Sequence, residues 1–325
     1  MNLTTKIIVS NRLLNIPYQL NMWFGCFILI TRNFSILGNI IVFFSRQFRN
    51  HSCTVYILSE TFVVIINFNF VLLTRVLQKG FQISIMNRFD KICKIRYFAS
   101  LYTDTLAFTL FILASLDRLL EAQRSPALRR WGGRVKLAYK LVFACTILCF
   151  LISCHRLILY STSTGHCLAQ AVIYAAFDNY FESVVSGICP PIIILMLSYL
   201  LVRNVRETIR RQTISTNVEH NGPTPNLTFL RKTDKQLTIM LIWQTFVAIP
   251  AFIPYVALLI YSSISANWSK SDEWLAWKNI VAETIRLLSY TFFSTQFYVL
   301  IISSHGIRKQ VLNIFIKRYT IHPTT

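Results

Sequence analysis

Two opposite charges end one of the long apolar stretches of this chain, where Asp117 and Arg118 stand side by side. Charges at the edge of a membrane-spanning helix are costly and are usually retained for a function. Arginine presents five donors in a fixed plane and is suited to carboxylates, so Arg118 could pair with acidic side chains. The alternative is that Arg118 marks the membrane edge and extends into the lipid headgroups.

Two cysteines lie at the outer ends of apolar stretches. Cys93 precedes Arg118 by 25 residues, a helical length of about 38 Å, so the two residues belong on opposite sides of a bilayer. Cys167 also sits at the outer end of an apolar stretch. On the oxidising side of a membrane we expect these two cysteines to form a disulfide. The other six are expected to be small buried residues.

Polar residues also interrupt the outer halves of the apolar stretches. Ser100 and Asp104 are one helical turn apart, and Glu283, Arg286 and Tyr290 follow each other three and four residues apart. Each set therefore lies on one helix face, and ionisable residues in apolar helices rarely face lipid. We expect these five to line a cavity that binds a charged ligand; a structural pair of Asp104 with Arg286 is the alternative. Further polar candidates are Asp178, Tyr180 and Glu182.

The elements that position these residues must be membrane helices. The chain is 54% hydrophobic and 14% charged, whereas soluble domains carry about 25% charged residues. A helix needs about 20 apolar residues to cross a bilayer, and lipid does not tolerate unpaired backbone polar groups. We therefore expect an all-α fold, a seven-transmembrane helix bundle with a short amphipathic eighth helix. The expected spans are residues 22–45, 54–77, 92–119, 137–160, 172–202, 236–262 and 279–303.

The distribution of charge predicts the topology. The net charge of +20 suggests a nucleic-acid partner, but the basic residues are divided among segments between the spans, so we exclude nucleic acid. Basic excess on the cytoplasmic side places the N-terminus on the outer side of the membrane. We expect an extracellular segment 1–21, one helical domain 22–303 with a cytoplasmic loop at about 203–235, and an amphipathic helix and cytoplasmic tail at 304–325. That last segment would contact membrane lipids, unless it is a frayed basic tail.

Other features narrow the functional class. Asn2 and Asn267 begin N-glycosylation sequons on segments expected outside. The six histidines are scattered without paired spacing, so neither a metal site nor a cofactor is expected. The paired intramembrane motifs of enzymes and the internal repeats of transporters are not found, so we do not expect an enzyme or a transporter.

Four short motifs follow one another in a particular order. They are Gly38-Asn39, Asp117-Arg118-Leu119, Pro190-Pro191 followed by Tyr199, and Phe252-Ile253-Pro254-Tyr255. In order and spacing they resemble the motifs of rhodopsin-like G-protein-coupled receptors, over nearly the whole chain. The sequence as a whole is most similar in character to invertebrate orphan receptors, which are distantly related to neuropeptide receptors.

The resemblance implies a two-state receptor that converts binding of an extracellular ligand into activation of a heterotrimeric G protein. When inactive, Arg118 would pair with Asp117 and with Asp234, which stands 20 residues before Pro254, where the family carries an acid. Tyr199, Phe252 and Pro254 would complete the activation switch. Ser100 stands where amine receptors carry aspartate, which argues against a monoamine, and a peptide ligand is expected.

The chain also departs from the family. The aspartate of helix two is replaced by Val64, with Glu60 one turn earlier, and the Asn-Pro-x-x-Tyr motif of helix seven is replaced by Gln296-Phe297-Tyr298-Val299-Leu300. These departures put sodium regulation and the usual helix-seven switch in doubt. The alternative function is a seven-helix chemosensory ligand-gated channel or another membrane protein that does not use G proteins. Such a protein would not need Cys93, Asp117-Arg118 and Pro254 in register.

Overall fold

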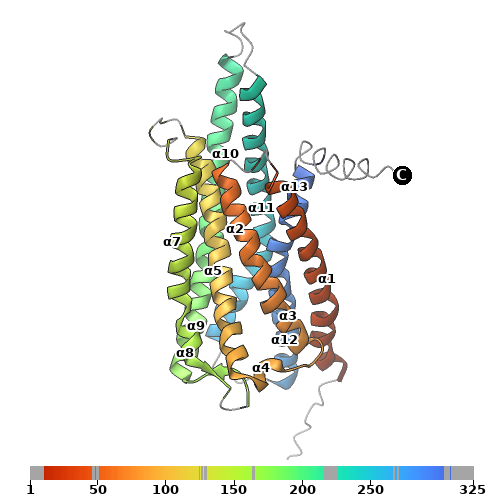
Figure 1. The fold of residues 1–325 in the computed structure, drawn as a ribbon. Coiled ribbons are helices and arrows are strands. Elements are labelled where there is room, and N and C mark those ends of the chain that lie inside the picture. The colour runs from red at the N-terminus through yellow and green to blue at the C-terminus, as the bar shows by residue number, and fades with distance from the viewer. Residues whose placement is uncertain are drawn as a thin grey trace, which may run out of the picture.

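Long helices make up most of the protein (Figure 1). The computed structural model describes residues 11–45, 48, 51–123, 125, 127, 130–162, 165–215, 225–265, 268, 271–303 and 308. Its elements are α1 (Asn11–Phe43), α2 (Ser52–Ile66), the π-helix η1 (Asn67–Leu72), α3 (Leu73–Lys79), α4 (Ile85–Arg88), α5 (Asp90–Glu121), α7 (Val135–Ser153), α8 (His155–Leu159), β1 (Tyr160–Ser161), β2 (Leu168–Ala169), α9 (Val172–Glu182), the π-helix η2 (Ser183–Ile188), α10 (Cys189–Ser215), α11 (Pro225–Ile264), α12 (Asp272–Ser294) and α13 (Gln296–Ser303).

The apolar helices make the chain a multi-pass membrane protein. In the described part, six helical segments are long and apolar enough to cross a bilayer, and α12 with α13 is a seventh if this pair, bent by 51°, is counted as one span. The six segments are Leu13–Phe43, Ser52–Lys79, Asp90–Glu121, Val135–Leu159, Val172–Asn204 and Thr238–Ser262. Their order follows the sequence expectation.

Two expected boundaries differ from the observed ones. α1 begins at Asn11 rather than at residue 22, because polar residues such as the fully buried Asn21 point inward and do not end the helix. The expected span 279–303 begins earlier and is broken. Ser271 caps α12 by accepting a hydrogen bond from the Trp274 amide, and the regular helix stops at Thr295. The expected helix at 304–325 lies outside the described residues, except for residue 308.

Helix α5 occupies the centre of the packing, because it contacts α2, α7, α10 and α11. Its inward face carries fully buried apolar residues such as Phe111 and Ala114. Large apolar side chains on the outer helices point away from this core, among them Trp23 at 73% and Phe143 at 68% exposure. An apolar interior and an apolar outside together are what a lipid environment requires.

Two π-helical turns, rather than the prolines, interrupt the regular helices. η1 lies between α2 and α3, and η2 lies between α9 and α10, immediately before Pro190. α11 continues as one helix through Pro250 and Pro254. A π turn inserts an extra residue and so re-aims the side chains that follow it, which is why such turns are frequent at functional sites.

One end of the bundle is closed by short elements. α4, α8 and the β1–β2 ribbon, in which Tyr160 pairs with Ala169, lie together at the bottom of Figure 1. A disulfide joins Cys93, near the start of α5, to Cys167, just before β2, with their Cα atoms 5.7 Å apart. We call this the disulfide end. At the opposite end, α10 and α11 extend beyond the other helices.

Candidate functional site

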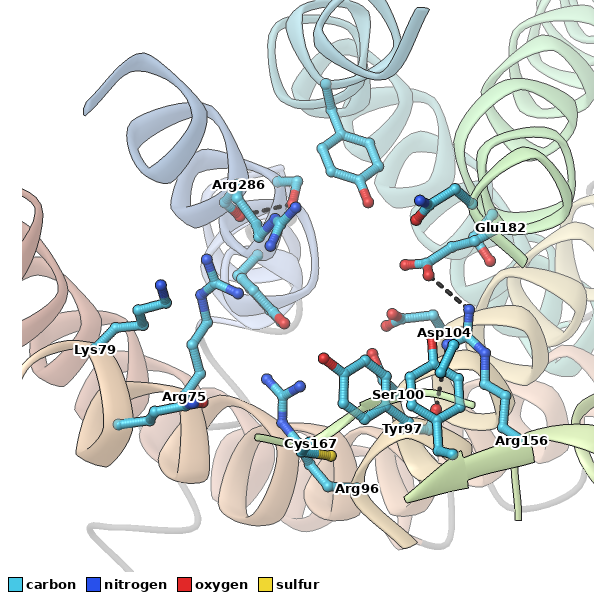
Figure 2. A pocket seen from close by; sticks show the side chains of 18 of the residues that line it. Arg75, Lys79, Arg96, Tyr97, Ser100, Asp104, Arg156, Cys167, Glu182 and Arg286 are labelled. Carbon is cyan, nitrogen blue, oxygen red and sulfur yellow. Dashed lines mark hydrogen bonds and ion pairs between the residues drawn. The ribbon is translucent and has the colours of Figure 1, made fainter. Parts of the chain in front are cut away.

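A cavity of about 670 Å³ opens between the helices near the disulfide end (Figure 2). Cavities of 300–1,000 Å³ are the usual size of small-molecule sites. Its wall includes all five residues that the sequence nominated, which are Ser100, Asp104, Glu283, Arg286 and Tyr290. The pattern of polar residues in the outer halves of the helices therefore located a real concavity. What it binds is a separate question.

The α5 side of the cavity depends on the π turn η1. Asn67, its first residue, donates from Nδ2 to Asp104 Oδ1 at 2.8 Å and to Thr103 Oγ1 at 2.7 Å. Arg96 lies one and two turns before the two nominated residues of α5 and also lines the cavity. The sequence contained this signal, since residues 96, 100 and 104 continue one helix face, but Arg96 was not nominated for the site.

The α12 side is organised by an ion pair. Glu283 pairs with Arg75 of α3, and it also accepts a hydrogen bond from Asn21 Nδ2 at 3.1 Å. Arg75 lies nine residues after the end of α2, inside the expected span 54–77, and was not nominated for the site. No ion pair joins Asp104 to Arg286 in the described part of the chain. The two residues face the cavity from different sides in Figure 2, so the structural pair considered above does not form.

Arg156 of α8 holds the third side. Its Nε donates to Asp178 Oδ1 at 2.9 Å, its Nη2 to Glu182 Oε2 at 2.7 Å and its Nη1 to the Tyr97 carbonyl at 3.2 Å. The Tyr160 hydroxyl donates to Asp178 Oδ2 at 2.7 Å. Burial and the nearby Asp178 carboxylate raise the pKa of Tyr160 well above its usual range, so the phenol stays protonated. Arg156 was not nominated because it ends an apolar stretch without a helical partner.

Aromatic rings form the floor of the cavity. Phe252 of α11 is 3% exposed and packs edge to face on Phe108 and Phe292, with ring centroids 5.1 Å apart in both cases. Phe293 lies 5.1 Å from Phe108. Phe252, Phe108 and Phe293 also line the cavity, so anything bound there would touch the aromatic core directly. Edge-to-face pairs of this kind stabilise a defined packing.

A second charged group lies at the other end of α5. Arg118 Nη2 is 2.8 Å from Asp117 Oδ2, and Arg118 Nη1 is 2.7 Å from Glu121 Oε2. Asp117 also accepts hydrogen bonds from Ser52 Oγ at 2.6 Å and from the Gly133 amide at 3.1 Å. Arg118 is 2% exposed and therefore does not extend into headgroups. We call Asp117, Arg118 and Glu121 the α5 charge cluster.

One expected switch residue is placed differently, one has a side chain outside the described part, and one contact of Arg118 was not expected. The sequence missed Glu121, although it follows Arg118 by three residues on the same helix face. The side chain of Asp234 lies outside the described part, so its pairing with Arg118 stays a prediction. Tyr199 is 68% exposed and points away from the bundle, contrary to the expectation. Leu197 is buried, and two residues turn a helix by about 200°, which carries Tyr199 to the outer face.

A polar network connects α1, α2 and α13 in the interior. Gln296 Nε2 donates to Glu60 Oε2 at 2.9 Å, and Asn39 Nδ2 donates to Gln296 Oε1 at 3.2 Å. The contact from α2 is thus made by Glu60, one turn before the expected Val64. Arg32, which had no predicted partner, is fully buried and donates to the carbonyl oxygen of Phe293.

Comparison with protein-family models and with curated proteins finds no match. Among the described residues, no cluster of His, Cys, Asp or Glu could hold a metal ion. The function is therefore inferred from the geometry of the site and from the motif resemblance.

Proposed function

We propose that this protein is a rhodopsin-like G-protein-coupled receptor of the plasma membrane, with its disulfide end outside the cell. In this proposal an extracellular ligand, a peptide, binds in the cavity, and a heterotrimeric G protein binds at the opposite end. The observation that carries it is the arrangement along α5. One helix supplies Ser100 and Asp104 to the cavity and Arg118 to a buried charge cluster at its far end.

The packing suggests how the two ends would communicate. A ligand shifts a receptor between states only if it interacts differently with them. Phe252 of α11 lines the cavity and packs on Phe108 of α5, so a ligand that displaces this ring would move α11 relative to α5. At the far end, Ser198 of α10 and Thr245 of α11 share a hydrogen bond of 2.5 Å. This contact would have to adjust as α11 moves, while the α5 charge cluster holds the resting state.

The test is guanine-nucleotide exchange by purified protein in lipid nanodiscs, with a panel of heterotrimeric G proteins and a peptide library. At least one pair of peptide and G protein should give ligand-dependent exchange. Arg118→Gln should abolish that exchange and leave peptide binding intact. The matched control is Lys140→Gln, an exposed cation of α7, which should behave like the parent protein.

The outcome also separates the proposal from the alternative. Ligand-dependent ion current in planar bilayers, without exchange on any G protein, would assign the chain to the chemosensory channel class. Exchange that persists at full rate in Arg118→Gln would remove the charge cluster from the mechanism.

A further inference from the structure

The wall of the cavity carries more positive than negative charge. It includes five cationic side chains and three carboxylates, an excess of two positive charges. The cations are Arg75, Lys79, Arg96, Arg156 and Arg286, and the carboxylates are Asp104, Glu182 and Glu283. These helices are membrane spans, where charges without partners are costly.

The excess positive charge belongs to cations that have no acidic partner. Arg75 pairs with Glu283, and Arg156 pairs with Glu182 and with Asp178, which is not part of the wall. When Asp178 is counted, the excess is one positive charge. The three remaining cations have no carboxylate within ion-pairing distance among the described residues; they are Arg96, Arg286 and Lys79. Arg96 is 9% exposed, and its Nε has no hydrogen-bond partner. Guanidinium groups in this state have unused donors for an anion.

Two of the three unpaired cations lie on one side of the cavity, together with Arg75. Arg286 and Arg96 line the same cavity as Arg75. In Figure 2, Arg75, Lys79 and Arg286 occupy one side of the cavity. The acids Asp104 and Glu182 lie on the other side, next to Arg156. Like charges held together in a low-dielectric space favour any ligand that brings an opposite charge between them.

We infer that the cavity binds a ligand through an oxyanion held between Arg96 and Arg286, with Lys79 at the exposed rim. The planar guanidinium of arginine can form two parallel hydrogen bonds to a carboxylate. Tyrosines of the wall, among them Tyr97, Tyr255 and Tyr290, offer aromatic surface to the rest of the ligand. The ligand that these side chains predict is a peptide with a free C-terminal carboxylate. Its description as a peptide rests on the proposed function, whereas the anion preference follows from the cavity alone.

The experiment compares two probes that differ only in this group. N-acetyl-diphenylalanine as the free acid and as the carboxamide are titrated against the full-length protein in nanodiscs, and binding is measured by microscale thermophoresis. The free acid should bind roughly tenfold more tightly, which corresponds to about 1.4 kcal/mol. Inorganic phosphate at equal ionic strength is the third probe.

Arg286→Gln should reduce the ratio of acid to amide affinity to near one. The matched control is Lys278→Gln on the same helix, which removes an equal charge from a side chain that stacks over Trp274. Because the ratio is internal to each variant, a variant that fails to fold loses both probes and is recognised as such. Arg96→Gln is then the second variant, with the same expected result.

Equal affinity for acid and amide in the parent protein, or no binding of either up to about 10 mM, would overturn the inference. So would an unchanged ratio in both arginine variants. Phosphate binding more tightly than the free acid would overturn the assignment to a peptide terminus. None of these measurements involves a G protein, so binding of the acid without nucleotide exchange would reject the receptor proposal and leave the anion site standing.

Discussion

Removing the cation of Arg156 should destabilise the disulfide end more than removing any exposed cation. Arg156 is 1% exposed and Asp178 is 2% exposed, and the guanidinium makes three hydrogen bonds of 2.7–3.2 Å. Arg156→Met keeps most of the side-chain volume but leaves two carboxylates without their counter-charge. Breaking a buried ion pair from one side costs about 3–5 kcal/mol, and we expect a loss of that size in the free energy of unfolding.

The assay is reversible unfolding in mixed micelles, followed by far-UV circular dichroism as sodium dodecyl sulfate is added. Arg203→Met is the control, because Arg203 pairs with Glu207 at 3.6 Å and its side chain is 65% exposed. Exposed pairs of this kind contribute within about 0.5 kcal/mol. The double variant Arg156→Met with Asp178→Asn should recover part of the loss, since one stranded charge is removed. A loss no larger than that of the control, or no recovery in the double variant, would refute this account of the cluster.

Three further predictions concern other parts of the chain. Cys93→Ser should lower the free energy of unfolding by about 4 kcal/mol, because the disulfide closes a loop of 74 residues; the same loss should appear when the parent is unfolded under reducing conditions. Gly38→Ala should cost about 1–3 kcal/mol in the micelle assay, since the added Cβ would lie 2.2 Å from the ring of Phe297, and equal stability would show that this contact is absent. Glu121→Gln and Asp234→Ala should each raise basal nucleotide exchange, because each removes an acid that would hold Arg118 in the inactive state. If the parent signals and basal exchange is unchanged in both variants, these acids do not hold Arg118 in that state.

The parts that the sequence predicted are those controlled by single-helix patterns. The apolar runs predicted the membrane-spanning helices, because the thickness of the bilayer sets the length of such a helix. Helical spacing placed Ser100 and Asp104 on one face, because that relation depends on α5 alone. Tyr199 was misplaced because its position was taken from a motif, whereas the burial of Leu197 fixes which face of α10 points inward.

The remainder depends on contacts between distant segments. Asn67 reaches Asp104 through the π turn η1, and a π turn has no sequence signature that periodicity can detect. Arg75 belongs to the site because Glu283 lies opposite it, 208 residues away. The apolar run around Arg75 did not reveal its role, because the carboxylate that makes its burial possible lies on another helix. Charged residues at the ends of apolar stretches are therefore ambiguous until the facing helix is known.

Asp104 and Arg286 should act independently on an anionic ligand. Asp104 is held by Asn67 at 2.8 Å, and Arg286 lies across the cavity near Glu283, so neither depends on the other for its position. Asp104→Asn removes a negative charge and should tighten binding of the free-acid probe, whereas Arg286→Gln should weaken it. In the double variant the two changes in binding free energy should add within about 0.5 kcal/mol, as for sites without a shared contact. The reversed pair, Asp104→Arg with Arg286→Asp, provides the sharper check. If the change in binding free energy of that double reversal departs from the sum of the two single changes by more than about 0.5 kcal/mol, the two residues do interact, and the separation of charge on which the anion site depends would have to be abandoned.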